Sequence, residues 1–296
     1  MKNNKFLIIY SIFILLLTIY IVLDTFVLST AITKVQNNTN TKVINNSESI
    51  KKTEDTYIDD NINISIKTYR EYNTNIYVAD IKVNNSLLLK TAFANNTYGK
   101  NITNKTSNIS NSVNAILAIN GDFYGVQEKG YVLKNGVIYR NTSKNDQQDL
   151  VIYNDGSFEI INENEISLDT LLKNGAYNIL SFGPSLIENY DITVSENEEV
   201  GKAMASNPRT SIGIIDNNHY IFIVSDGRTD DSEGLSLYEL ASFMKTLNIK
   251  TAYNLDGGGS STMYFNGNII NNPTTNGRNI SERSVSDIVY IGYWWL

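Results

Sequence analysis

Cysteine is absent from this chain of 296 residues, histidine occurs once, and there are only 3 prolines. Without cysteine there can be no disulfide framework, no zinc–thiolate site and no thiol nucleophile. Ser–His catalysis and multi-histidine metal chemistry would both depend on His219. The surrounding stretch NNHYIFIV is typical of a turn that leads into a strand, so we interpret His219 as structural.

Positive charge is also scarce, because 24 Lys and Arg residues stand against 31 Asp and Glu residues, a formal net charge of -7. A nucleic-acid-binding protein needs a concentrated basic face that displaces counterions. We therefore expect no nucleic-acid partner. Hydrophobic residues make up 42% of the chain and charged residues 19%, which is ordinary for a folded globular protein.

The N-terminus contains a long apolar run, from Phe6 to Leu28, which follows two lysines. About 20 residues at a rise of about 1.5 Å are enough to cross a hydrocarbon core of roughly 30 Å. Lysines in front of such a run stay in the cytoplasm, which places the rest of the chain outside. We favour an uncleaved, single-pass signal anchor over residues 1–28. Cleavage after Ala31, which would give a secreted protein, is the alternative.

A polar stretch and a series of short β-type runs follow this apolar segment. Residues 29–60 are rich in Asn, Thr, Lys and Ser, which predicts a flexible stalk. From residue 61 onward, apolar and polar residues alternate as they do in half-buried strands. The continuous apolar run at 115–121 favours a strand buried on both faces. Asn135-Gly136 predicts a hairpin turn.

Helical patterns are few. Residues 236–248 place apolar side chains on one stripe, and Ser236 with Glu239 matches a capping box. A shorter helix is expected within 167–175. The pattern predicts an α+β fold with a large, mostly antiparallel sheet system and few helices, in one extracytoplasmic domain over residues 61–296, behind the N-terminal transmembrane helix.

Polar turns that could carry chemistry follow several of the predicted strands. These are NGDFYG (120–125), NPRTSIG (207–213), SDGR (225–228), NLDGGGSST (254–262) and NGRNISERSVSD (276–287). Loops at strand ends are where a rigid scaffold presents binding groups. The three consecutive glycines could expose backbone amides as an anion-binding nest, or they could allow a tight bend and a close strand crossing. A Walker phosphate loop is excluded because its Gly-Lys-Ser/Thr ending is missing.

Taken together and in this order, NGDFY, NPRTSIGI, the stretch from SDGR to NLDGGGSSTM, and SERSVSDIVYI resemble the phosphodiester glycosidase family. That family includes a lysosomal uncovering enzyme and bacterial exopolysaccharide-related proteins. The resemblance runs from about Ala115 to Tyr290. It implies hydrolysis of a sugar-1-phosphate phosphodiester in cell-surface or exopolysaccharide glycans, with a phosphorylated glycan as substrate and no cofactor. Cysteine-rich modules are missing here, so only the class of bond is carried over.

The residue types in these motifs suit that reaction. Cleavage at the anomeric carbon passes through an oxocarbenium-like state, and the departing phosphate needs charge stabilisation. Arg209, Arg228 and Arg283 are the expected phosphate donors, although each could instead form a salt bridge with a neighbouring acid. Asp256 is the expected central carboxylate and Asp122 the second choice. The carboxylates would supply the nucleophile or the base, and Asp226 and Glu282 are further catalytic candidates. The candidate substrate-binding residues are Asn120, Thr210, Asn254, Gly257, Gly258, Gly259, Ser260 and Ser261.

Other functions fit the same sequence less well. A non-catalytic phosphoglycan-binding or polysaccharide-assembly protein could share the fold. A phosphodiesterase that cuts the P–O bond with two metals is disfavoured by the single histidine. The acidic stretch around Asp230, Asp231 and Glu233 suggests calcium, but it lacks the ligand spacing of an EF-hand, so we favour a solvated loop and predict no metal site.

Overall fold

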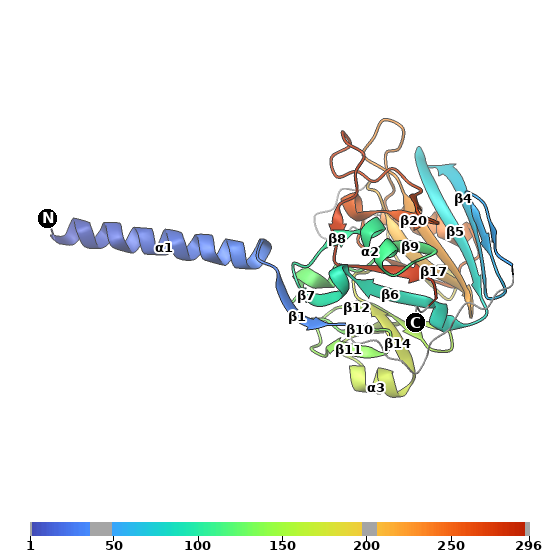
Figure 1. Cartoon of the computed structure of the whole chain (residues 1–296), viewed down its shortest axis with the longest axis horizontal. Helices are drawn as coiled ribbons and strands as arrows, with labels where there is room; N and C mark the ends of the chain where they lie inside the picture. The colour runs from blue at the N-terminus through green and yellow to red at the C-terminus, as the bar shows by residue number, and fades with distance from the viewer. Residues whose placement is uncertain (1, 36–48, 197–205, 294–296) are drawn as a thin grey trace.

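The computed structural model describes residues 2–35, 49–196 and 206–293 (Figure 1). Helix α1 (Lys2–Phe26) projects away from the rest of the molecule. Its segment Lys5–Phe26 has 22 residues and a mean hydropathy of 2.9, and none of its apolar window is buried against the rest of the protein. By length and composition it is apolar enough to cross a membrane, and a signal sequence has the same character.

A nine-stranded antiparallel sheet is the largest element of the domain. Its long strands β4 and β5 form a hairpin in which Ile62, Ile64 and Ile66 point into the core, as the alternating sequence predicts. In spatial order the strands are β16 (Asp191–Ile192), β15 (Ser185–Glu188), β19 (Thr251–Asn254), β17 (Thr210–Asp216), β18 (His219–Ser225), β5 (Thr74–Val83), β4 (Ile62–Glu71), β3 (Thr56–Ile58) and β2 (Lys51–Lys52).

A five-stranded antiparallel sheet packs against the larger one. Its central strand is buried at every residue, which confirms the prediction for the apolar run at 115–121. Ile64 and Phe222 of the large sheet and Ile119 and Val289 of the small sheet belong to one buried cluster, so the two sheets share a core. The order is β21 (Asn268–Ile269), β20 (Met263–Phe265), β9 (Leu117–Asn120), β23 (Asp287–Ile291) and β6 (Leu89–Phe93).

Smaller elements complete the domain, and every strand pairing within the described residues is antiparallel, which confirms the predicted fold class. The hairpin turn at Asn135-Gly136 has φ of 52° and 78°, as its sequence predicts. These elements are β10 (Val132–Lys134) with β11 (Val137–Arg140), β13 (Phe158–Asn162), β12 (Gln148–Tyr153) and β14 (Ala176–Leu180) in one sheet, β8 (Asn104–Lys105) with β22 (Ser284–Val285), β1 (Thr30–Lys34) with β7 (Thr97–Lys100), α3 (Leu168–Lys173), and the short helices η2 (Ser86–Leu88), η3 (Ala94–Asn96), η4 (Tyr124–Val126) and η5 (Gly258–Ser260).

The helices match the sequence patterns with one exception. Helix α4 (Leu237–Thr246) begins after Ser236, whose capping box with Glu239 is formed, and its apolar stripe covers the outer face of the large sheet. Helix α2 (Thr106–Ser112) is not predicted, because TSNISNS is polar. Its Ile109 nevertheless packs in a buried cluster with residues of the small sheet, so a tertiary contact stabilises a helix that its own sequence does not favour.

The stretch 29–60, predicted as a flexible stalk, instead contributes strands to the domain. β1 pairs with β7, and β2 and β3 extend the large sheet beyond β4. Tyr57 is buried in the main core, which fixes this edge of the sheet in place. Residues 36–48 lie outside the described residues. The polar composition of this stretch favours a flexible segment. Composition alone carries no information about pairing with strands that are distant in the sequence, so the pairing is not predicted.

Candidate active site

The site lies where strand ends of the two sheets meet. Asn120 ends β9 of the small sheet, and Asp256 follows the end of β19 in the large sheet. The Asn120 amide group donates to the backbone oxygen of Asp256, and the Asp256 amide donates to the Gly121 oxygen over 3.3 Å. Asn120 Oδ1 accepts from Thr210 Oγ1 at 2.8 Å and from the Thr262 amide at 3.2 Å. Asn120 and Thr210 therefore hold three predicted motifs together.

Asp256 forms a compact polar group with Arg283 and Ser260. Arg283 Nη2 lies 3.0 Å from Asp256 Oδ2, and Ser260 Oγ donates to the same oxygen over 2.6 Å. Burial raises the pKa of Asp256 above its usual value, although Arg283 and Ser260 act in the opposite direction. The side chains are 13% exposed for Asp256 and 42% for Arg283. Asp256 is therefore a partly exposed carboxylate with a raised pKa and a cation beside it, which makes it a candidate functional residue.

Arg228 adds a second guanidinium to this group. Its Nη2 and Nε donate to Asn207 Oδ1 over 2.7 and 3.2 Å, and its Nη1 donates to the Thr275 oxygen over 2.6 Å. Burial and then the positive charge of Arg283 lower the pKa of Arg228, so the two cations act on each other. Its backbone φ of 64° is rare for a side-chain-bearing residue. Two guanidiniums that act on each other, only one of which is paired with a carboxylate among the described residues, suit an anionic ligand.

Two other predicted substrate-binding residues are buried in the domain. Arg209 is 3% exposed, its Nε donates to the Leu235 oxygen over 2.7 Å, and it lies against Gly257. Asn254 is 1% exposed, and its side-chain nitrogen donates to the Gly183 oxygen over 2.7 Å. Both residues support the loops of the site from within.

The three glycines stand where the backbone passes close to other groups. A Cβ atom on Gly257 would lie 2.8 Å from the Pro208 oxygen, and one on Gly259 would lie 2.4 Å from Thr275 Oγ1. Gly258 has a φ of 61°, and a Cβ atom there would lie 2.9 Å from Arg228 Nη2. Each glycine is thus required by close packing against a different neighbour, and only Gly258 lies against the guanidinium.

Several amides of this loop are used inside the protein. The amide of Gly258 donates to the Pro208 oxygen over 2.7 Å, and those of Ser260 and Ser261 donate to the oxygens of Gly257 and Gly258 over 3.3 and 3.1 Å. The side chain of Ser261 is buried. An anion nest over Gly257–Gly259 stays a prediction, whereas the alternative, a close crossing, describes the observed packing.

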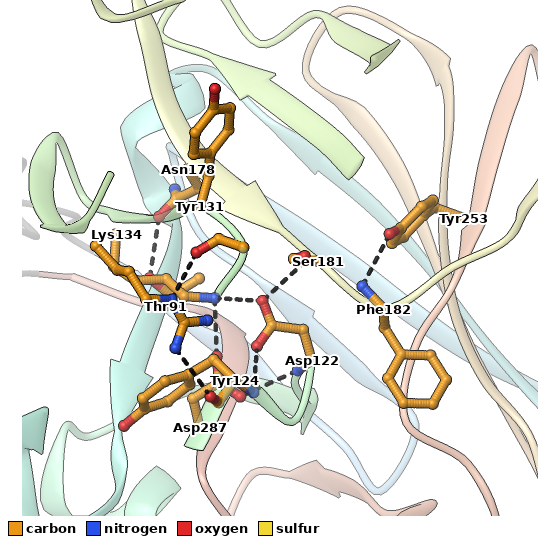
Figure 2. Close-up of polar contacts among 12 residues, drawn as sticks. Thr91, Asp122, Tyr124, Tyr131, Lys134, Asn178, Ser181, Phe182, Tyr253 and Asp287 are labelled. Carbon is orange, nitrogen blue, oxygen red and sulfur yellow. Dashed lines mark hydrogen bonds and ion pairs between the residues drawn. The ribbon is translucent and has the colours of Figure 1, made fainter. Parts of the chain in front are cut away.

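Asp122 lies in a sealed ionic cluster with Lys134 and Asp287, neither of which is among the predicted site residues (Figure 2). Lys134 Nζ lies 2.9 Å from Asp122 Oδ2 and 2.9 Å from Asp287 Oδ2, and the three side chains are at most 2% exposed. The amides of Ser181 and Tyr124 also donate to the Asp122 carboxylate, over 3.0 and 3.2 Å. Asp122 is therefore enclosed on all its polar sides, whereas Asp256 reaches the surface.

The titration of this cluster reflects its burial. Burial alone would lower the pKa of Lys134, but the charges of Asp122 and Asp287 raise it above its usual value. Burial and then the charge of Asp122 raise the pKa of Asp287 to about 6, against the influence of Lys134. A lysine inside the apolar strand sequence YVLK is the signal that could have pointed to Lys134.

The remaining predicted acids bond away from the Asp256 group. Asp226 accepts from the Tyr77 hydroxyl at 3.0 Å and from the Asn272 amide at 2.7 Å. Glu282 accepts from the amide of Ser107 at 2.9 Å, in the first turn of α2. These contacts fix the loops that flank Arg228 and Arg283. Catalytic roles for both acids stay predictions.

The acidic loop and the histidine have ordinary surroundings. Asp230, Asp231 and Glu233 are exposed, and His219 Nε2 lies 2.9 Å from Asp80 Oδ1 on the neighbouring strand. In residues 2–35, 49–196 and 206–293, no group of three or more His, Asp or Glu side chains is placed to hold a metal ion.

Comparison with known proteins agrees with the motifs. Residues 113–292 match the family described as phosphodiester glycosidase. A prophage-derived uncharacterized protein of Bacillus subtilis, YomE, is 28% identical over 59% of this chain and 26% of its own length. Mouse N-acetylglucosamine-1-phosphodiester alpha-N-acetylglucosaminidase is 33% identical over 29% of this chain and 17% of its own. This chain thus spans about a quarter or less of the length of these relatives.

Solved structures share the fold. The zebrafish N-acetylglucosamine-1-phosphodiester alpha-N-acetylglucosaminidase catalytic domain, auto-inhibited by its pro-peptide, superimposes with a TM-score of 0.62 at 20% identity, over 89% of this chain and 87% of that one. A hypothetical protein from Synechocystis gives a TM-score of 0.54 at 16% identity, over 78% of this chain and 62% of that one. At these identities the likeness concerns the fold.

Proposed function

Since this chain belongs to the phosphodiester glycosidase family, we propose that it hydrolyses a sugar-1-phosphate phosphodiester linkage in a cell-surface or exopolysaccharide glycan. The observation that carries the proposal is the group formed by Asp256, Arg283 and Arg228 at the meeting of the two sheets. The name of the mouse relative makes an α-linked N-acetylglucosamine-1-phosphodiester the first substrate to test.

The two arginines take the phosphate side of the reaction. The bond between the anomeric carbon and the phosphate oxygen breaks, and its electron pair leaves with the phosphomonoester. Arg228 and Arg283 stabilise this developing charge, since guanidinium groups match phosphate oxygens in pairs. A substrate phosphate competes with Asp256 for Arg283, which frees the carboxylate for its own task.

Asp256 takes the sugar side. It either attacks the anomeric carbon or accepts a proton from the attacking water, and these routes give opposite configurations at that carbon. In both cases water supplies the new hydroxyl of the sugar, so the products are a reducing sugar and a phosphomonoester. The configuration of the released sugar therefore decides between nucleophile and base.

The test uses the full chain in detergent with methyl phospho-α-N-acetylglucosaminide in ¹⁸O-labelled water. We expect free N-acetylglucosamine that carries the label at its anomeric carbon, together with unlabelled methyl phosphate. Label in the phosphate would overturn the proposal in favour of a phosphodiesterase. Binding of phosphoglycans without release of any reducing sugar, across a panel of wall and capsular polymers, would favour the non-catalytic alternative.

We also propose that this activity lies outside the cell membrane, and the N-terminal helix supports this. Lys2 and Lys5 precede the apolar segment, which favours a cytoplasmic N-terminus and an extracytoplasmic domain. N-terminal sequencing of the mature protein tests the retained signal anchor. A mature chain that starts at Ile32 would show cleavage and secretion instead.

A further inference from the structure

The junction between α1 and the domain is a bonded contact. β1 follows the helix closely and pairs with β7, with Thr30 opposite Lys100 and Lys34 opposite Thr97. A Cβ atom on Gly99 would lie 2.1 Å from the Thr30 oxygen, so this approach depends on a glycine. The backbone after the helix is therefore seated on the domain from its first residues.

Side chains of the domain also bind the end of the helix itself. The Asn101 side-chain nitrogen donates to the backbone oxygens of Thr25 and Leu28, both over 3.1 Å. Lys100 Nζ lies 3.8 Å from Asp24 Oδ2. The last carbonyl groups of a helix have no partners within it, so Asn101 supplies a cap from the domain. These bonds set the direction of α1 relative to the domain.

Apolar surface continues from the helix onto the domain at this junction. Ile32 of β1 is 63% exposed and Val126 of η4 is 45% exposed. Both line one cavity of about 260 Å³, and the charged residues Lys100, Glu128 and Arg140 also line it. In Figure 1, β1 and β7 lie on the side of the domain that faces α1, and β4 lies on the opposite side. Exposed apolar side chains beside a membrane-spanning helix are suited to the lipid headgroup region.

We propose that the face formed by β1, β7 and η4 rests on the outer surface of the lipid bilayer and that Ile32 and Val126 insert into it. The occupant is a lipid surface because the helix whose end this face binds is long enough to span the bilayer. The inference depends on the proposed retention of α1 and does not depend on the proposed reaction. It holds the active site at a fixed height above the membrane.

The absence of cysteine makes this testable with single spin labels. Ile32→Cys and Val126→Cys are prepared in the full chain, labelled with a nitroxide and placed in nanodiscs of phosphatidylcholine and phosphatidylglycerol. Ile58→Cys is the matched control, since Ile58 is 38% exposed in β3, which lies beside β4 away from α1. Collision rates are measured with lipid-soluble oxygen and with a water-soluble nickel chelate.

We expect loss of nickel collisions and a gain of oxygen collisions at positions 32 and 126, with free nickel access at position 58. Equal nickel access at all three positions would overturn the inference. Alkaline carbonate extraction separates the two possible failures. If the chain stays in the membrane and the label at position 126 is accessible to the nickel chelate, only the docked face is contradicted. If the chain is extracted, both the anchor and the docked face are contradicted.

Discussion

Two carboxylates lie where the sheets meet, one at the surface and one sealed. Asp256 keeps 13% of its side chain exposed and has Arg283, itself 42% exposed, as its cation. Asp122 keeps 1% exposed and shares Lys134 with Asp287. The open pair can exchange its partner for a ligand, because solvent reaches both members. The sealed cluster cannot, because its three side chains are buried and bonded to one another inside the protein.

The sealed cluster instead positions the open pair. The amide of Gly121 donates to the Asp287 backbone oxygen over 2.9 Å, and its carbonyl accepts from the Asp256 amide at 3.3 Å. A Cβ atom on Gly121 would lie 2.1 Å from Asp287 Oδ1, so this connection has no spare room. The contrast teaches that similar acids at strand ends divide into a buried support and an accessible group according to how completely their side chains are enclosed.

The largest expected effect comes from the open carboxylate. Asp256→Asn should lower kcat by about 10²–10⁴-fold, the usual contribution of a positioned acid or base. The thermal unfolding midpoint should change little, since Arg283 remains solvated. Release of reducing sugar from the methyl phosphodiester measures the rate. Asp231→Asn, in the exposed acidic loop, is the control and should keep wild-type turnover. Wild-type turnover of Asp256→Asn would remove it from the mechanism.

Breaking the sealed cluster should affect stability first. Lys134→Met leaves two buried carboxylates without their cation and should lower the free energy of unfolding by about 3–5 kcal/mol. Urea denaturation followed by fluorescence measures it. The matched control is Lys245→Met, whose pair with Asp191 spans 3.4 Å with side chains 50% and 87% exposed. An exposed pair contributes about 0–1 kcal/mol. Equal losses in both variants would contradict the comparison.

The sequence predicts the strands that carry the site, because alternation and turn residues are local signals. It predicts Asp256 as the central carboxylate and Asp122 as the second choice, but it does not predict that Asp122 is enclosed. Enclosure depends on Lys134, which lies outside the motifs, and on Asp287, which is far away in the chain. The same reason explains the missed α2 and the pairing of β1 with β7. Local sequence patterns do not predict which distant segments pair in the fold.

Arg228, the second cation near Asp256, is proposed to bind the substrate phosphate, and its substitution tests that role. Arg228→Gln should raise KM by about 10–100-fold, since a hydrogen bond to a charged group contributes about 1.5–3 kcal/mol. The fall in kcat should be smaller than for Asp256→Asn, and it measures the part of the Arg228 interaction that develops only in the transition state. Arg228→Lys keeps the charge and loses the fork, so it should recover part of the affinity. Unchanged KM in Arg228→Gln would place the phosphate elsewhere.

The smallest effect tests how far the sealed region extends. Asp149 is fully buried, and burial and then the charge of Glu163 raise its pKa well above the usual value. The unfolded chain releases this proton near pH 4 and the folded chain only at higher pH, so stability should fall as pH rises above about 4. Asp149→Asn cannot ionise, so its urea midpoint should fall less between pH 4 and pH 8.

The control for this slope is Asp155→Asn. Hydrogen bonds from Ser157 lower the pKa of Asp155, so its contribution is present above about pH 4 and is lost as pH falls through the lower folded pKa, the opposite sign. Parallel curves for wild type and Asp149→Asn would show that Asp149 has the same proton affinity in both states. The enclosed region would then end at Lys134 and its two carboxylates, and the contrast with the open pair would depend on that cluster alone.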